Sequence, residues 1–180
     1  MISQAAIRYA QALFELAEEQ NQTSEIYSEI VELNDVISSN RNLYDVLRSP
    51  FIGKDEKKSV AAELFAQSVH KDTKNFLMVL IDNDRTTELS SIVQAYKQML
   101  NDKFNIAEGE VFTAILLSPE QISELEKKLS AKYNKNVKLE NKIDKGILGG
   151  VLVRIGNEEI DGTVKSRLSD LSEVLSQVIS

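Results

Sequence analysis

The sequence has no cysteine and only one histidine, His70, among its 180 residues. Without cysteine the chain can form no disulfide bond, no thiolate metal site and no cysteine nucleophile. A lone histidine without an obvious carboxylate partner in the sequence is more typical of a surface residue or a helix-end cation than of a metal ligand or general base. These shortages argue against enzymes that use a cysteine nucleophile, a thiolate metal site, or a histidine as base or metal ligand.

Long apolar runs are also missing, since no segment approaches the roughly 20 apolar residues that span a bilayer. The first residues carry one arginine and lack the order of charged region, apolar region and cleavage site that marks a signal. We therefore expect neither a secretory signal nor a transit peptide. A protein that faces the cytosol is the expectation.

Catalytic motifs are absent as well: the sequence has no Walker A, Gly-x-Ser-x-Gly, His-Glu-x-x-His or EF-hand pattern. Three glycines, Gly146, Gly149 and Gly150, lie close together, but a phosphate-binding loop would lead into a helix and here a strand pattern follows. We expect no enzyme, no cofactor and no metal ion. A pair of carboxylates assembled only by folding would escape this search, so an enzyme stays open.

The formal net charge is −7, from 28 acidic and 21 basic side chains, so the overall field repels nucleic acid and anionic lipid headgroups. One local exception is a group of five lysines, namely Lys132, Lys135, Lys138, Lys142 and Lys145. Glu140 and Asp144 interrupt it, and only Tyr133 is near enough in sequence to stack on a base. We interpret these lysines as solvated faces, with an RNA-binding domain as the alternative.

Apolar spacing predicts six helices before residue 105. They are expected over residues 3–19, from Thr23 or Ser24 to residue 37, over residues 43–47, from beyond Gly53 to residue 69, from an Asp72 cap through residues 76–81, and from Thr86 or Thr87 to residue 104. The run from residue 76 to residue 81 is apolar on all sides, which indicates a helix that is either central or shared with a partner.

The first helix carries two apolar stripes rather than one. The first stripe is Ala6, Ala10, Leu13, Phe14 and Ala17, and the second is Ile2, Ala5, Tyr9, Ala12 and Leu16. One stripe is enough to join a bundle. The second could be buried by further helices or could be free for a partner, and spacing alone does not separate these cases.

After Asn105 the pattern changes to short strands. Residues 111–117 are a strand candidate. A helix is expected to start with a capping box at Ser118, Pro119 and Gln121. The inward stripe of that helix is Ile122, Leu125, Leu129 and Tyr133. The next segments are two paired strands, over residues 137–143 and 151–155, joined by a glycine bend. They are followed by a hairpin turn at Gly156-Asn157 and a return strand over residues 158–161. Asp161 or Thr163 can cap a last helix.

These patterns predict an α+β protein that is mostly α. An N-terminal six-helix bundle domain of residues 1–105 is followed by a small C-terminal α/β domain of residues 106–180.

Residues 142–168, KIDKGILGGVLVRIGNEEIDGTVKSRL, strongly resemble the C-terminal signature of the delta subunit of F-type ATP synthases, the oligomycin sensitivity-conferring protein family. Thr163 and Ser166 stand where the family pattern has serine and glycine. The opening helix, AIRYAQALFELAEE, is similar to the family's as well. The signature positions are Gly149, Gly150, Asp161, Gly162 and Arg167.

The resemblance implies a non-catalytic stator subunit of the peripheral stalk, which joins the catalytic head to the b subunits and resists rotor torque. The location implied is the cytoplasmic side of the cell membrane, peripheral, within a complex that couples proton transport to ATP synthesis. The family's helical domain binds the N-terminal helix of an alpha subunit in a groove between its first and fifth helices. That groove corresponds here to Tyr9, Ala12, Leu16, Phe76, Val79 and Asn83, although spacing alone fits a core equally well.

The resemblance also implies that the C-terminal domain holds the b subunits, with the last apolar positions as the contacts: Leu171, Val174, Leu175 and Val178. Neither nucleic acid nor direct insertion into a bilayer is expected. The alternative function is a free-standing adaptor or chaperone-like module that binds amphipathic helices.

Overall fold

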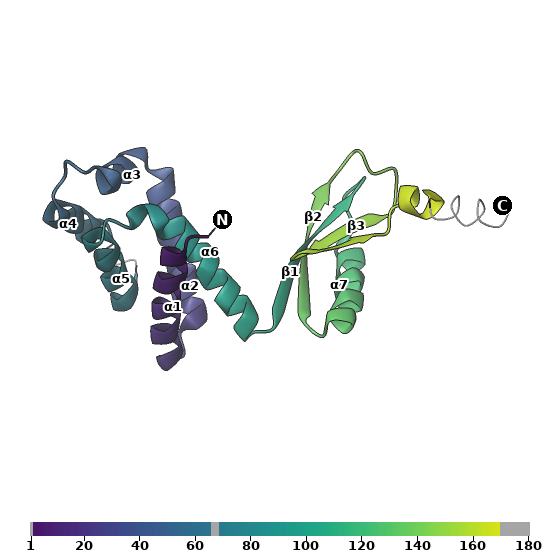
Figure 1. Cartoon of the computed structure of the whole chain (residues 1–180), viewed down its shortest axis with the longest axis horizontal. Helices are drawn as coiled ribbons and strands as arrows, with labels where there is room; N and C mark the ends of the chain where they lie inside the picture. Colours follow the sequence, from purple (N-terminus) through teal and green to yellow (C-terminus); the bar gives the residue numbers. More distant parts are fainter. Residues whose placement is uncertain (1, 66–68, 170–180) are drawn as a thin grey trace. The chain divides into compact units, whose positions relative to one another are not determined.

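The computed structural model describes residues 2–65 and 69–169. The chain divides into two compact units, Met1–Leu100 and Asn101–Ser180. The first unit is helical, and the second contains a four-stranded mixed sheet (Figure 1). The α+β class with most regular structure in helices, predicted from apolar spacing, is thereby confirmed.

The six predicted helices are present, and the sixth extends three residues past the end of the first unit. They are α1 (Gln4–Glu19), α2 (Thr23–Ser39), α3 (Arg41–Arg48), α4 (Lys54–Leu64), α5 (Lys71–Asp82) and α6 (Leu89–Lys103), the last entered through a 3₁₀ turn, η1 (Thr86–Glu88). Ser3 caps α1 as predicted, because its hydroxyl oxygen accepts a hydrogen bond from the Ala6 N–H at 3.0 Å. The Asn40 side chain does the same for Leu43 of α3 at 3.2 Å.

Two helix ends differ from the prediction. Helix α4 ends at Leu64, not at residue 69, and α5 has His70 rather than Asp72 at its N-cap. The cap of α5 comes from another helix: a Glu29 carboxylate oxygen of α2 accepts hydrogen bonds from the His70 N–H at 3.0 Å and from the Thr73 hydroxyl. A carboxylate satisfies the free N–H groups of a helix start from any position in sequence, so local spacing could not show this.

The core of the first unit joins α1, α2, α5 and α6 around Tyr96. That ring is fully buried, makes an edge-to-face contact with Phe14 at 5.1 Å between centroids, and donates its hydroxyl hydrogen to the Thr23 carbonyl at 3.0 Å. Burial raises the pKa of Tyr96, so the hydroxyl stays protonated. The fully buried large apolar side chains around it are Ile26, Ile30, Leu33, Leu77, Leu80, Ile81 and Ile92.

The sheet of the second unit has the order β2-β1-β3-β4. Its elements are β1 (Ile106–Thr113), α7 (Pro119–Tyr133), β2 (Asn136–Ile143), β3 (Val151–Ile155) and β4 (Glu158–Asp161), as Figure 1 shows except for the β4 label. β1 and β2 are parallel with α7 as their crossover, whereas β3 pairs antiparallel with both β1 and β4. The capping box of Ser118 and Gln121 is confirmed, as is the hairpin turn at Gly156-Asn157.

Two strand predictions are wrong. β1 starts at Ile106 and ends at Thr113, before the predicted end at residue 117. The chain leaves the strand there because the Thr113 hydroxyl donates to the Ile115 carbonyl at 2.7 Å and the Leu117 N–H donates to Asn141 Oδ1 at 2.8 Å. The strands on either side of the glycine bend are not paired with each other, since β1 lies between them. Pairing order depends on the crossover through α7, which strand patterns do not encode.

The two faces of this sheet differ in polarity. Val111, Val137 and Val153 are buried together with Leu129 of α7 and form the core of the unit. On alternate residues, β1 to β4 carry charges instead, with ion pairs Lys142–Glu110 and Arg154–Glu159. All five lysines of the group are exposed, and Lys142 pairs with Glu110, in keeping with the interpretation as solvated faces.

Candidate partner-binding surface

Helix α1 uses its two apolar stripes differently. All five residues of the first stripe are buried, and Ala6, Ala10 and Ala17 are completely inaccessible. The second stripe remains accessible: Tyr9 is half-buried, Ala12 is exposed, and Leu16 is 37% exposed. In the isolated chain, the second stripe is therefore surface.

Helix α5 repeats this division. Leu77, Leu80 and Ile81 are buried in the core, whereas Phe76 is half-buried and Val79 is 45% exposed. Asn83, the residue directly after the helix, is also exposed. Of the two interpretations of the apolar run at residues 76–81, a fully central helix does not fit these exposures.

The accessible sides of α1 and α5 meet. The Tyr9 and Phe76 rings are in edge-to-face contact, with centroids 6.4 Å apart and an interplanar angle of 72°. Near the C-terminal end of α1, Gln20 Nε2 donates to Asp72 Oδ2 of α5 at 2.8 Å. We refer to the predicted groove residues as the α1–α5 surface, which consists of Tyr9, Ala12, Leu16, Phe76, Val79 and Asn83.

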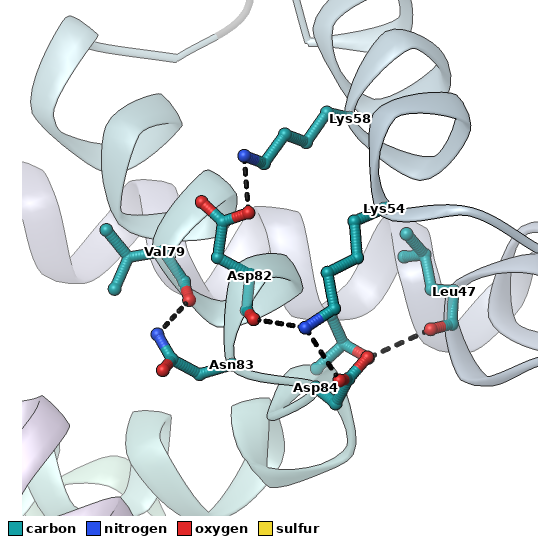
Figure 2. A network of polar contacts seen from close by, with 8 residues as sticks. Leu47, Lys54, Lys58, Val79, Asp82, Asn83 and Asp84 are labelled. Atoms are coloured by element: carbon teal, nitrogen blue, oxygen red, sulfur yellow. Dashed lines mark hydrogen bonds and ion pairs between the residues drawn. The ribbon is translucent and has the colours of Figure 1, made fainter. Parts of the chain in front are cut away.

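A polar network fixes the C-terminal end of α5 (Figure 2). Lys54 Nζ, at the start of α4, donates to the Asp82 carbonyl at 2.6 Å and lies 3.0 Å from Asp84 Oδ2. The hydrogen bond from Lys54 lowers the pKa of Asp84, and Lys58 pairs with the Asp82 carboxylate. Asn83 Nδ2 donates to the Val79 carbonyl at 2.8 Å, so the last turn of α5 is held by its own side chain and by α4.

Sequence analysis missed this network. Lys54 and Asp82 are 28 residues apart, and lysines and aspartates at helix ends are ordinary surface residues. The sequence does carry Asn83 and Asp84, residue types that tolerate a positive φ, and Asp84 adopts a φ of 53° in the tight turn after α5.

The signature of the second unit forms a close backbone contact. The Gly162 N–H donates to the Val151 carbonyl at 2.8 Å, and the Val164 N–H donates to the Gly149 carbonyl at 2.9 Å. Gly150 has a φ of 82°, and a Cβ there would lie 2.3 Å from the Gly162 carbonyl oxygen. The bend can therefore pass this close to the end of β4 only with glycine at position 150.

The other signature residues shape the start of the last helix. Thr163 caps residues 164–169, because its hydroxyl oxygen accepts from the Ser166 N–H at 3.2 Å. The Thr163 N–H donates to Asp161 Oδ1 at 2.8 Å, and hydrogen bonds from Thr163 lower the pKa of Asp161. Arg167 is exposed, and the predicted stalk contacts lie outside the described residues: Leu171, Val174, Leu175 and Val178.

The described residues offer neither a grouped set of metal ligands nor a helix that could cross a membrane. Within residues 2–65 and 69–169, no three His, Cys, Asp or Glu side chains are grouped as metal ligands. His70 is an exposed residue whose Nδ1 lies 3.6 Å from Asp72 Oδ2. No helix among the described residues is long and apolar enough to cross a membrane. What the described residues do provide is an accessible apolar surface on α1 and α5.

The profile of the ATP synthase delta (OSCP) subunit family matches residues 5–175, and the chain belongs to this family. It is 51% identical to the ATP synthase subunit delta of Clostridioides difficile (strain 630), over all of both chains. It is 34% identical to that of Clostridium beijerinckii over 93% of this chain and 94% of the relative. The fold is similar to a chain of the Toxoplasma gondii mitochondrial ATP synthase hexamer, with a TM-score of 0.69, 21% identity and 99% coverage of both chains.

As a member of this family, the chain is a non-catalytic component of the peripheral stalk, the stator of an F-type ATP synthase. The resemblance found in the sequence is confirmed. Membership excludes the free-standing adaptor and the RNA-binding domain as descriptions of this protein.

The contact between Gly150 and Gly162 generates a stability prediction. Gly150→Ala should lower the free energy of unfolding of the second unit by about 2 to 3 kcal/mol, because it combines a strained φ with a backbone clash. Gly156→Ala is the matched control: its φ is 58° but nothing lies within 4 Å, so strain alone should cost about 1 kcal/mol. Urea unfolding measures both, and equal losses would show that the close contact does not matter.

Proposed function

We propose that the α1–α5 surface binds the N-terminal helix of an alpha subunit in the catalytic head. The observation that carries this proposal is the double use of α1 and α5. Each buries one apolar face in the core and leaves a neighbouring apolar face accessible, and the two accessible faces meet at Tyr9 and Phe76. An amphipathic helix laid along such a surface buries its own apolar stripe against it.

The composition of this surface suits helix docking. Ala12 is small, so the backbone of a bound helix can approach α1 closely at that point. Tyr9 and Phe76 are half-buried against the core and so lose little side-chain freedom on binding, which favours aromatic anchors. Leu16 and Val79 supply aliphatic contact area on either side.

We further propose that the chain forms two domains, residues 1–105 and 106–180, with one adhesive surface each. The second domain would hold the b subunits through its last apolar residues, including Leu171 and Leu175. A stator needs both attachments, because it resists torque on the head only if it binds the head and the stalk at the same time. The complex would place the chain at the cytoplasmic side of the cell membrane as a peripheral protein.

Substitutions on α1 separate partner binding from folding. Ala12→Leu adds bulk to an exposed position, so the melting temperature should hardly change, while affinity for a synthetic peptide of the alpha subunit's N-terminus should fall about tenfold or more. Leu16→Ala should weaken the peptide by about 1 to 2 kcal/mol. Phe76→Ala should cost about 2 kcal/mol of binding, and also some stability because the ring packs on the core.

Ile7→Ala is the matched control for Leu16→Ala, since Ile7 is 42% exposed on the same helix but is not part of the α1–α5 surface. It should bind the peptide like the parent. Calorimetric titration and thermal melts measure these quantities. If Ala12→Leu unfolds the first unit, or leaves peptide affinity unchanged, the proposed surface is wrong.

A fragment of residues 1–105 tests whether the first domain folds and binds the alpha-subunit helix without the second domain. The core cluster of the first unit lies between Ala6 and Tyr96, so the fragment keeps its whole core and should melt cooperatively with helical circular dichroism. It should bind the alpha-subunit peptide like the full chain and should not capture b subunits. A fragment without a cooperative melt, or one that captures b subunits like the full chain, would contradict the two-domain arrangement.

A further inference from the structure

Phe51 is the most exposed large apolar residue among those described, at 95% of its surface. It lies in the connection between α3 and α4, which reads Ser49-Pro50-Phe51-Ile52-Gly53. A single exposed apolar side chain is common on protein surfaces and by itself indicates nothing. The way in which this loop is held distinguishes Phe51 from such a residue.

Both ends of the loop are tied to the turn that follows α5. Before the loop, the Leu47 carbonyl accepts a hydrogen bond from the Thr86 hydroxyl at 3.3 Å. After the loop, Lys54 contacts the Asp82 carbonyl and the Asp84 carboxylate, as Figure 2 shows. The loop therefore projects from a fixed base.

The loop is also ordered internally. Ser49 Oγ accepts a hydrogen bond from the Phe51 N–H at 3.3 Å, and Pro50 has its φ restricted by its ring. An aromatic side chain that is presented on an ordered loop loses little backbone freedom when a partner covers it. This is the usual condition for a binding anchor.

The base of the loop is the C-terminal end of the α1–α5 surface. Asp82 and Asp84, which hold Lys54, flank Asn83 in sequence, and the Asn83 side chain is bonded to Val79 (Figure 2). The loop that carries Phe51 is thus anchored to the residues on either side of Asn83, the last residue of the α1–α5 surface.

We propose that Phe51 is an anchor for the chain segment that adjoins the bound helix in the same partner, and that this segment presents an apolar pocket or side chains to the ring. This inference rests on the proposed function, because the groove-bound helix brings the segment to the loop. It adds a second contact, outside the helix itself, to the attachment of the catalytic head.

The test compares two probes with one variant. The probes are a synthetic peptide restricted to the alpha subunit's N-terminal helix and the catalytic head purified without this subunit. Phe51→Ala should bind the peptide with unchanged affinity and should bind the head about tenfold or more weakly. Its melting temperature should match that of the parent, because the side chain is 95% exposed.

Two control variants define the chemistry. Phe51→Leu keeps an apolar side chain and should recover most of the affinity for the head. Leu148→Ala removes an apolar side chain that is 86% exposed in the second unit and should leave head binding unchanged.

Equal head binding by the parent and Phe51→Ala would overturn the inference and leave the proposed function standing. A parent that binds neither probe would overturn both. A parent that self-associates in sedimentation, with Phe51→Ala monomeric, would identify a second copy of this chain as the occupant and would also overturn the inference.

Discussion

Close packing of the alanine face of α1 is the interaction on which the first unit depends. Ala6, Ala10 and Ala17 are completely buried, so neighbouring helices can approach the α1 backbone, and Phe14 reaches the central ring of Tyr96. The stripe next to this face remains accessible, since Ala12 is exposed and Leu16 is 37% exposed. Small and large apolar residues on one helix therefore provide both the packing of the unit and the surface that we propose as its binding site.

Residues of other helices fix both ends of α5. The end of α5 is held by Lys54 and Lys58 from α4, and its start is held by Glu29 from α2 and Gln20 from α1. In the second unit, the backbone contact between the glycine bend and residues 161–164 fixes the start of the last helix on the sheet. Exposed ion pairs contribute little to stability individually. Their effect here is to fix the direction of surface residues, which matters for a subunit that performs no chemistry.

Residue patterns predicted the parts of the fold that depend on local sequence. The buried stripe of α1, the Ser118 capping box and the Gly156 turn were all correct, because each is set by neighbours within a few residues. The predicted cap of α5 was wrong, because Glu29, which is distant in sequence, binds the start of this helix. The predicted pairing of the strands beside the glycine bend was also wrong, because β1, from an earlier part of the chain, lies between them. For the candidate surface, spacing identified Tyr9, Ala12 and Leu16 as a second stripe but could not distinguish surface from core. Only the three-dimensional structure shows the Lys54 network and the exposure of Phe51.

We propose that this chain holds the head stationary against the torque of the rotor, without taking part in catalysis. The most direct measurement uses membrane vesicles that contain the complete synthase with Ala12→Leu in this subunit, and compares ATP hydrolysis with ATP-driven proton uptake. We expect hydrolysis to continue while proton uptake per ATP falls, because a loosely held head turns with the rotor. Proton uptake per ATP equal to that of the parent, in a variant that has lost affinity for the alpha-subunit peptide, would contradict it.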